Sequence, residues 1–264
     1  MLPEKPFLPI TSRDNPRLKH LRGLLEHASV RRKSSQTVLE GIHLLDAYQR
    51  AGKIPDSIFI AESAQTHPEA NDLLDAWPSV ARFILPDALY KEMRTLGQGI
   101  DIMALIDTAF VALPEQLNTD VLILEDVQDA GNVGTLLRTA AAAGIKQVIC
   151  TKGTALVWSP RVLRAGMGAQ FGIQVIEHAD IKEILERLTI PLHATSSHAN
   201  QSLYALNLKT PIAWLMGNEG QGASQIALEN AISVSIPQPG GQESLNVAVA
   251  GAVCMFEMVR QRLI

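Results

Sequence analysis

Two kinds of apolar pattern alternate along most of this chain, and their order predicts a mixed α/β fold. Short continuous apolar runs, such as VLIL at 121–124, are typical of strands that a parallel sheet buries on both faces. Between these runs, apolar residues recur every three or four positions, which predicts amphipathic helices. Strands joined by helical crossovers imply a mostly parallel sheet with helices on both faces.

From residue 121 onward the alternation is regular. The predicted strands cover 121–125, 147–150, 173–176, 192–195, 212–216 and 232–236. The predicted helices cover 132–143, 160–167, 180–188, 223–230 and 244–263. We therefore expect one C-terminal α/β domain at 121–264.

The first part of the chain predicts a second, smaller α/β domain at 1–111. Its predicted helices cover 12–28, 41–51, 69–76 and 87–95. Its predicted strands cover 57–61, 81–85 and 102–106. The stretch 112–120, ALPEQLNTD, interrupts the pattern with a proline and polar residues, which is typical of a linker.

Composition narrows the class of protein. With 264 residues, 47% of them hydrophobic, the chain can form well-packed cores. No apolar run approaches the roughly 20 residues of a membrane span, and the first residues lack the zones of a signal peptide. We therefore expect a cytoplasmic protein without membrane association. The two cysteines and seven histidines lack the spacing of a disulfide framework or a metal site, which predicts no metal.

Basic residues gather near the N-terminus, although the formal net charge of the chain is −4. Between residues 11 and 33, two acidic residues stand against seven basic ones: Arg13, Arg17, Lys19, Arg22, Arg31, Arg32 and Lys33. A cluster of this size can neutralise several phosphates of a nucleic acid. A solvated helix face explains it equally well, so charge alone leaves RNA binding open.

One arginine, Arg138, stands inside the otherwise apolar helix predicted at 132–143. The helix follows a buried strand and a polar loop, and Asn132 is expected to cap it. We expect Asn132 and Arg138 to point toward the same mouth above the carboxyl end of the strand, where open α/β sheets bind ligands. The alternative is an arginine that keeps its charged group in water at the helix surface.

Two further loops at strand ends are rich in glycine and asparagine. The first contains GNEGQG at 217–222, whose G-x-x-G-x-G order matches neither the dinucleotide fingerprint nor the P-loop. The second spans 236–250, where Ser244 or Asn246 is expected to cap a helix that begins at Leu245. Capping explains one such loop, but it does not explain three loops at strand ends of one sheet.

Together the three loops resemble the motifs of the SpoU (TrmH-like) family of RNA ribose methyltransferases, members of the SPOUT class. The matching segments are Asn132-x-Gly134-x-x-x-Arg138, Gly217-Asn218-Glu219-Gly-x-Gly222, and Ile236-Pro237 with Ser244-Leu245-Asn246. The N-terminal half is similar to the substrate-binding domain common in this family, through Ser12 to Lys19, Glu40-Gly41-x-His43 and Gln98-Gly99.

Three positions depart from the family pattern. Ala130 stands where a proline often follows the aspartate of the first motif, and Gln238 stands where a methionine often follows Ile-Pro. Gly166 occupies a position where serine is common. None of these departures removes a residue expected to be catalytic, and all three bear on loop detail and substrate preference.

The resemblance implies a fold, a cofactor and partners. The C-terminal domain is expected to be a parallel-sheet α/β domain with a trefoil knot, and the N-terminal domain to bind RNA. The cofactor is expected to be S-adenosylmethionine, and the substrate a structured RNA, either tRNA or rRNA, methylated on a ribose 2′-hydroxyl. The family also implies a homodimer in which the loops of one subunit complete the site of the other.

The resemblance further implies roles for individual residues. Those expected at the reacting groups are Arg138, Asn132, Glu219, Ser244 and Asn246. Those expected at the cofactor are Thr195, Gly217, Gly222, Ile236, Pro237 and Leu245. The seven basic residues named above, together with Arg164, are expected to bind RNA.

The role of Arg138 has two versions. The family resemblance assigns it to activation of the hydroxyl, but a guanidinium with a pKa above ~12 does not take up a proton. Arg138 could instead bind the neighbouring phosphate and stabilise negative charge on the 2′-oxygen. A phosphate oxygen or the Glu219 carboxylate would then take the proton, although Glu219 could also only hold a loop.

Two other functions fit part of the sequence. The first is a catalytically inactive RNA-binding or ribosome-assembly protein on the same fold, against which the complete set of polar residues argues. The second is a nucleotide-dependent oxidoreductase built on GNEGQG, which the glycine spacing disfavours.

Overall fold

The computed structural model describes residues 6–108, 110–196, 199–241 and 244–263, and contacts divide the chain into two units. One unit comprises Met1–Phe110 with Trp158–Phe171, and the other comprises Val111–Val157 with Gly172–Ile264. Residues 158–171 therefore pack with the first unit, whereas the apolar pattern grouped them with the second. Leu163 and Phe171 belong to the first core, and helical spacing does not reveal to which core a helix adds its apolar face.

The first unit is built on a mixed five-stranded sheet. Its strands are, in sheet order, β1 (Phe7–Pro9), β4 (Ala81–Leu85), β3 (Ser57–Ala61), β5 (Ile102–Asp107) and β2 (Gln36–Glu40). The first three are parallel, and β5 runs antiparallel to both of its neighbours. Its helices are α1 (Pro16–Glu26), α2 (Ala28–Ser34), α3 (Ile42–Arg50), α4 (Pro68–Ala76), α5 (Asp87–Lys91) and α7 (Pro160–Gly166).

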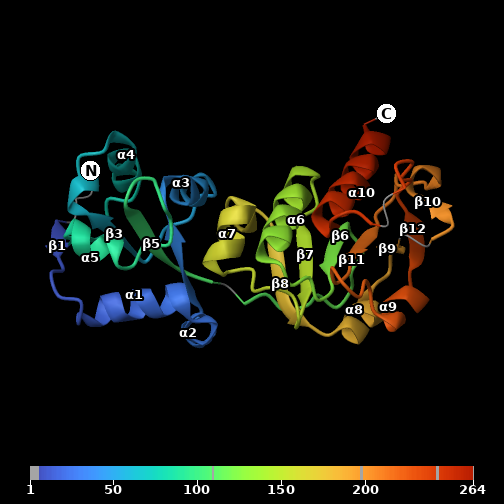
Figure 1. Cartoon of the computed structure of the whole chain (residues 1–264), viewed down its shortest axis with the longest axis horizontal. Helices are drawn as coiled ribbons and strands as arrows, with labels where there is room; N and C mark the ends of the chain where they lie inside the picture. Colours follow the sequence, from blue (N-terminus) through green and yellow to red (C-terminus); the bar gives the residue numbers. More distant parts are fainter. Residues whose placement is uncertain (1–5, 109, 197–198, 242–243, 264) are drawn as a thin grey trace. The chain divides into compact units, whose positions relative to one another are not determined.

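Helices cover both faces of this first sheet. In Figure 1, α1 and α2 lie on one side of it and α3 and α4 on the other. Leu18, Leu21 and Leu24 of α1 are fully buried, which confirms the apolar spacing that predicted this helix. The helix begins at Pro16, later than the predicted residue 12, because Asn15 caps it through its side chain.

The second unit contains the parallel sheet that the pattern predicted. Its seven strands are, in sheet order, β10 (Gln201–Ser202), β12 (Ile232–Ser235), β9 (Leu192–Thr195), β11 (Ala213–Met216), β6 (Val121–Leu124), β7 (Gln147–Thr151) and β8 (Gln174–Ala179). Every neighbouring pair is parallel. This arrangement confirms the predicted α/β class, while the trefoil knot stays a prediction.

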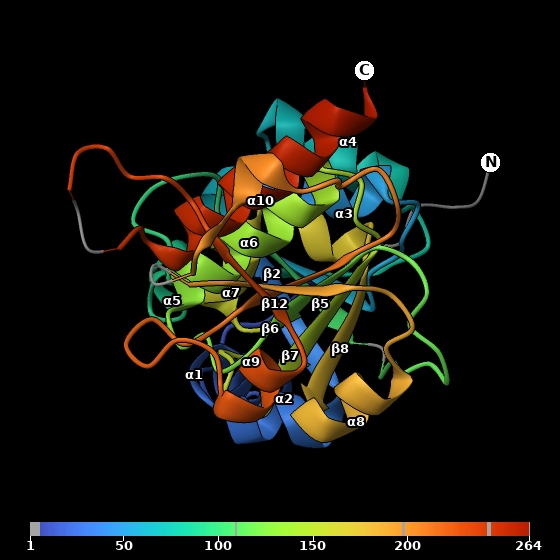
Figure 2. The same cartoon turned by 90° about the vertical axis from the view of Figure 1, so that its right-hand side faces the viewer.

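Helices lie on both faces of the second sheet, so its strands are apolar on both sides. Figures 1 and 2 show α6 (Ala130–Ala142) and α10 (Val247–Arg262) together on one face. The shorter α8 (Ile181–Arg187) and α9 (Gln225–Glu229) lie on the opposite face. Burial on both faces explains why β6 is a continuous apolar run with no exposed position.

The helix after the first loop is capped by a residue other than the expected Asn132, whereas the helix after the third loop is capped by Asn246, one of the two expected residues. Asp129 caps α6 by accepting a hydrogen bond from the backbone N–H of Asn132 at 2.8 Å, so the helix starts at Ala130. Asn246 caps α10 by accepting from the N–H groups of Ala248 and Val249, so that helix starts at Val247. Because Asn132 lies inside the first turn of α6, its side chain is free to bond elsewhere.

No helix in the described part of the chain is both long and apolar enough to cross a membrane.

Candidate functional site

Sheet order explains why loops distant in sequence meet at one place. Strands β12, β9, β11 and β6 are consecutive neighbours and all run in the same direction, so their carboxyl ends form one edge. The chain leaves β6 toward β7 on one side and reaches β11 on the other. Such a reversal of strand order is where open α/β sheets bind ligands.

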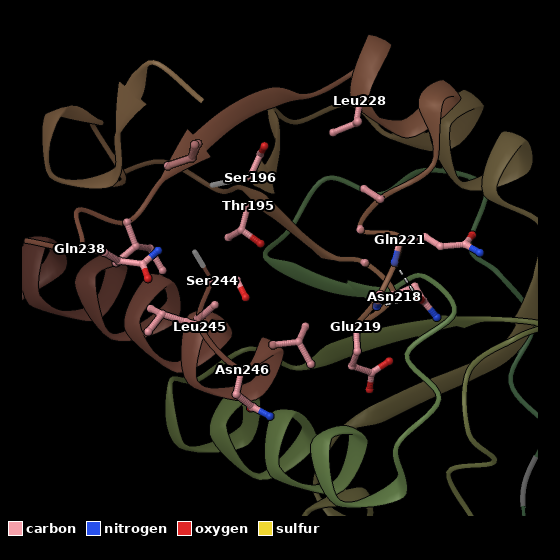
Figure 3. Close-up of a pocket in the computed structure, with 18 residues that line it drawn as sticks. Thr195, Ser196, Asn218, Glu219, Gln221, Leu228, Gln238, Ser244, Leu245 and Asn246 are labelled. Atoms are coloured by element: carbon pink, nitrogen blue, oxygen red, sulfur yellow. Dashed lines mark hydrogen bonds between the residues drawn. The ribbon is translucent and has the colours of Figure 1, made fainter. Parts of the chain in front are cut away.

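A pocket of about 590 Å³ lies at this edge. Figure 3 shows the loop after β11 on one side of it, and the segment that leads into α10 on the other. Eight of the predicted site residues line it: Thr195, Gly217, Glu219, Gly222, Ile236, Ser244, Leu245 and Asn246. Of the residues predicted at the reacting groups and the cofactor, three lie outside its lining: Pro237, Asn132 and Arg138.

A chain of hydrogen bonds connects the three loops. Asn246 Oδ1 accepts from the N–H of Ala248 at 2.9 Å, so Asn246 Nδ2 faces away from α10 and donates to Asn132 Oδ1 at 3.0 Å. Asn132 Nδ2 in turn donates to Glu219 Oε1 at 3.0 Å. Each bond determines which way the next amide points. Asn132 therefore contributes to the site by joining Asn246 to Glu219.

Glu219 joins the second loop to the first. Its two carboxylate oxygens accept hydrogen bonds from the backbone N–H groups of Gln128 and Asp129, both at 3.1 Å, in addition to the bond from Asn132. Partial burial by itself raises the pKa of Glu219, but the bonds from Asn132 and from these backbone groups outweigh it and lower the pKa. A carboxylate with three donors and a lowered pKa is a weak base, so this geometry suits positioning better than proton removal.

Asn218 shapes the second loop. Its Oδ1 accepts from the N–H groups of Gly220 at 2.9 Å and Gln221 at 3.0 Å, a local turn that asparagine favours. Its Nδ2 donates to the backbone carbonyl of Asp126 at 2.9 Å. Asp126 itself has a positive φ of 56°, and Thr151 Oγ1 and the Gly153 N–H donate to its carboxylate. Neither Asn218 nor Asp126 was among the predicted site residues, although an asparagine in a glycine-rich turn is a recognisable signal.

The side chains of Arg138 and Asn132, both on α6, point in different directions. Its side chain is exposed, and no hydrogen bond or ion pair joins it to another residue in the described segments. Six positions correspond to roughly 240° around a helix axis, so the two side chains of α6 leave on different faces. The expectation that both point into one mouth does not hold within a single copy of the chain.

The basic residues of the first unit are partly neutralised. Arg13 and Arg22 approach Glu92 at 3.3 and 3.8 Å, and Lys19 pairs with Asp14 at 2.9 Å. The remaining predicted RNA-binding side chains have varied environments. Arg17 lies over the ring of Phe83, Arg31 and Arg164 donate to backbone carbonyls, and Arg32 and Lys33 are exposed. RNA binding by these residues stays a prediction.

The described residues contain no group of three or more His, Cys, Asp or Glu side chains arranged to hold a metal ion.

Comparisons with known proteins identify the family of the chain. The model of the SpoU rRNA Methylase family matches residues 120–256. A tRNA/rRNA methyltransferase of Synechocystis, itself described as uncharacterized, is 33% identical over 258 residues, covering 96% of this chain and 94% of that protein. The 23S rRNA (guanosine-2′-O-)-methyltransferase RlmB of Bordetella pertussis is 32% identical over 255 residues and is covered to 93%, as is this chain.

Solved structures extend the similarity to the whole fold. The crystal structure of an RNA 2′-O ribose methyltransferase superposes with a TM-score of 0.82 at 30% identity, covering 97% of this chain and all of that one. The SpoU methyltransferase AviRb of Streptomyces viridochromogenes, solved with AdoMet, shares the fold with a TM-score of 0.86 at 21% identity, over 94% of this chain and 98% of AviRb. From the match to the family model and the relatives of similar length, the chain belongs to the SpoU rRNA methylase family.

Proposed function

We propose that this protein transfers a methyl group from S-adenosylmethionine to a ribose 2′-hydroxyl of a structured RNA, either tRNA or rRNA. The observation that carries the proposal is the single pocket lined by motif residues that are far apart in the chain. Relatives named as RNA methyltransferases, which match this chain over nearly its full length, support it. We further place the enzyme in the cytoplasm, where such substrates are found.

The pocket fits the cofactor in size and chemistry. Its volume of about 590 Å³ is within the usual range for small-molecule sites. Val234, Ile236 and Leu245 provide apolar wall for a flat adenine. Gly217 and Gly222 leave backbone groups uncovered. When bound, the cofactor supplies a methyl group on a positively charged sulfur.

Side chains orient the ribose and stabilise charge during the reaction. The bonds among Asn246, Asn132 and Glu219 hold the three loops so that Ser244 and Asn246 face the pocket and can orient a ribose. Because Glu219 already accepts three hydrogen bonds, its carboxylate is held in place, and either Glu219 or a phosphate oxygen of the RNA takes the hydroxyl proton. Arg138 supplies positive charge to that phosphate and to the developing 2′-oxyanion.

We place Arg138 at the pocket of a second copy of the chain. Val249 and Phe256 lie seven residues apart on α10, are 50% and 48% exposed, and form an apolar stripe on one face. That stripe is suited to pack against the same face of another copy. The helix α10 packs against α6, which carries Arg138, so pairing of two copies brings each Arg138 toward a partner.

The decisive experiment is methyl transfer to RNA. Purified protein is incubated with methyl-labelled S-adenosylmethionine and RNA from cells that lack the protein, and the digested nucleosides are identified by mass spectrometry. We expect a 2′-O-methyl nucleoside at one position of tRNA or rRNA. A base-methylated product contradicts the proposed reaction, and RNA binding without any methyl transfer identifies the protein as the inactive RNA-binding alternative.

Replacing Gly217 by alanine should distort the second loop and so impair the pocket. A Cβ atom at this position would lie 2.3 Å from the Ala223 nitrogen and 2.4 Å from the Gly222 carbonyl carbon, both backbone atoms that cannot give way alone. The loop must therefore shift, and we expect at least a tenfold loss of affinity for S-adenosylhomocysteine in calorimetric titration. Gly240→Ala is the matched control, because a Cβ there meets nothing within 4 Å; equal affinities in the two variants would contradict the expectation.

A further inference from the structure

Gln238 presents an unsatisfied polar atom at the pocket. Its side-chain oxygen Oε1 is buried and has no hydrogen-bond partner among the described residues, and Gln238 is part of the pocket lining. The backbone at this point is held in a turn, since the Gly241 N–H donates to the Gln238 carbonyl at 3.1 Å. A buried acceptor without a donor is unfavourable, so the side-chain amide gains by turning this oxygen toward an N–H or O–H group of a ligand in the pocket.

The position of Gln238 follows from strand periodicity. Val234, Ile236 and Gln238 all line the pocket, while Pro237 between them is exposed and lies outside the lining. Alternate residues of an extended segment share one side. The wall that continues from β12 therefore presents two apolar side chains followed by one amide, and Figure 3 shows Gln238 on the side of the pocket formed with Ser244 and Leu245.

A primary amide beside an apolar wall is complementary to adenine. The amide places one acceptor and one donor next to each other, and adenine places its 6-amino donor next to a ring-nitrogen acceptor. The ribose and the amino-acid portion of the cofactor have no flat apolar ring whose edge carries a donor next to an acceptor. Ile236 and Val234 are suited to the ring face and Gln238 to its edge.

We propose that Gln238 recognises the adenine edge of the cofactor, with Oε1 accepting from the 6-amino group and Nε2 donating to the adjacent ring nitrogen. The inference rests on the proposed function, because it assumes that this pocket takes S-adenosylmethionine. Methionine, which is common at this position in the family, cannot make either bond. This chain therefore selects its cofactor base through a side chain that relatives with methionine do not have.

Equilibrium binding tests the proposal without catalysis. Wild-type protein and Gln238→Met are titrated with S-adenosylhomocysteine and with its analogue in which purine, lacking the 6-amino group, replaces adenine. We expect the wild type to favour the adenine ligand by about tenfold, the effect of one lost hydrogen bond to a buried group. Gln238→Met should bind the two ligands within about twofold of each other. Gln221→Met is the matched control, because Gln221 lines the same pocket but is exposed, and it should keep the wild-type ratio.

The outcomes separate this proposal from the proposed function. If the wild type binds both ligands equally, or Gln238→Met keeps the wild-type ratio, Gln238 does not recognise adenine although the pocket still takes the cofactor. If the wild type binds neither ligand, the cofactor assignment itself fails, and the proposal with it. Gln238→Leu gives the same measurement should the methionine variant not fold, and the comparison of ligands on the wild type needs no variant.

Discussion

Arg138→Ala should lower methyl transfer by roughly 10²–10³-fold while leaving the fold and cofactor binding intact, since removal of one preorganised donor to a developing oxyanion has an effect of that size. The side chain is exposed and has no described partner, so its truncation should change the free energy of unfolding by less than about 0.5 kcal/mol. The measurements are labelled methyl transfer to RNA, thermal unfolding and titration with S-adenosylhomocysteine. A folded, cofactor-binding variant with the wild-type rate would remove Arg138 from the mechanism.

Arg138→Lys distinguishes charge stabilisation from proton removal. Lysine keeps the positive charge but loses the bidentate geometry of the guanidinium. We expect partial activity and an unchanged pH profile if Arg138 only binds phosphate and stabilises charge. A new ionisation in the pH profile of the lysine variant would instead assign the proton transfer to this position.

Mixed subunits test whether Arg138 serves a partner's pocket. Arg138→Ala lacks the arginine but keeps the pocket, whereas Gly217→Ala keeps the arginine but has an impaired pocket. After the two impaired variants are unfolded and refolded together, the mixed dimers should contain one complete site and regain activity above that of either variant alone, measured at a cofactor concentration that does not saturate Gly217→Ala. No recovery, or a protein that light scattering shows to be monomeric and active, contradicts the proposed exchange between subunits.

Glu219→Ala should disconnect the second loop from the first. It removes the acceptor of three hydrogen bonds, from Gln128 N–H, Asp129 N–H and Asn132 Nδ2. Because the carboxylate is exposed, water replaces part of what is lost, and we expect a destabilisation of about 1–2 kcal/mol in chemical unfolding. Displacement of Asn132 and Asn246 should reduce methyl transfer by at least tenfold.

The same residue predicts a pH dependence of stability. The pKa of Glu219 is lower in the folded protein than its ordinary value of 4.5, so its stabilising contribution is fully present above that value and is lost as pH falls through the folded-state pKa. The stability difference between wild type and Glu219→Gln should therefore shrink as unfolding is measured at decreasing pH below 4.5. Glu229→Gln, at an exposed position bonded only to Gln225 within its own helix, is the control and should show no such trend. A constant difference across this range would mean that the carboxylate charge does not stabilise the loops.

Apolar periodicity predicted the central strands well and missed three of the four edge strands. The strands predicted at 57–61, 81–85 and 192–195 match β3, β4 and β9 in both bounds. The three missed strands, β1, β2 and β10, all lie at sheet edges. An edge strand has a partner on only one side and tolerates short length and polar residues, so its local pattern is weak.

Part of the candidate site could be predicted from the sequence and part could not. Motif chemistry identified eight residues that do line one pocket, because the residue types that suit a ligand are visible in each loop separately. The roles of Asn132, Asp129 and Gln238 were not visible, since each depends on what lies opposite. Asn132 bonds a glutamate 87 positions away, and Gln238 Oε1 has no hydrogen-bond partner among the described residues.

The sequence by itself determined the alternation of strands and helices and the polar character of three loops, because both depend on residues close together in the chain. Only the tertiary structure decided that β12, β9, β11 and β6 are neighbours, that residues 158–171 join the first core, and that Asn132 joins Asn246 to Glu219. Those features depend on hydrogen bonds and packing between distant segments, whose free energies no local pattern contains.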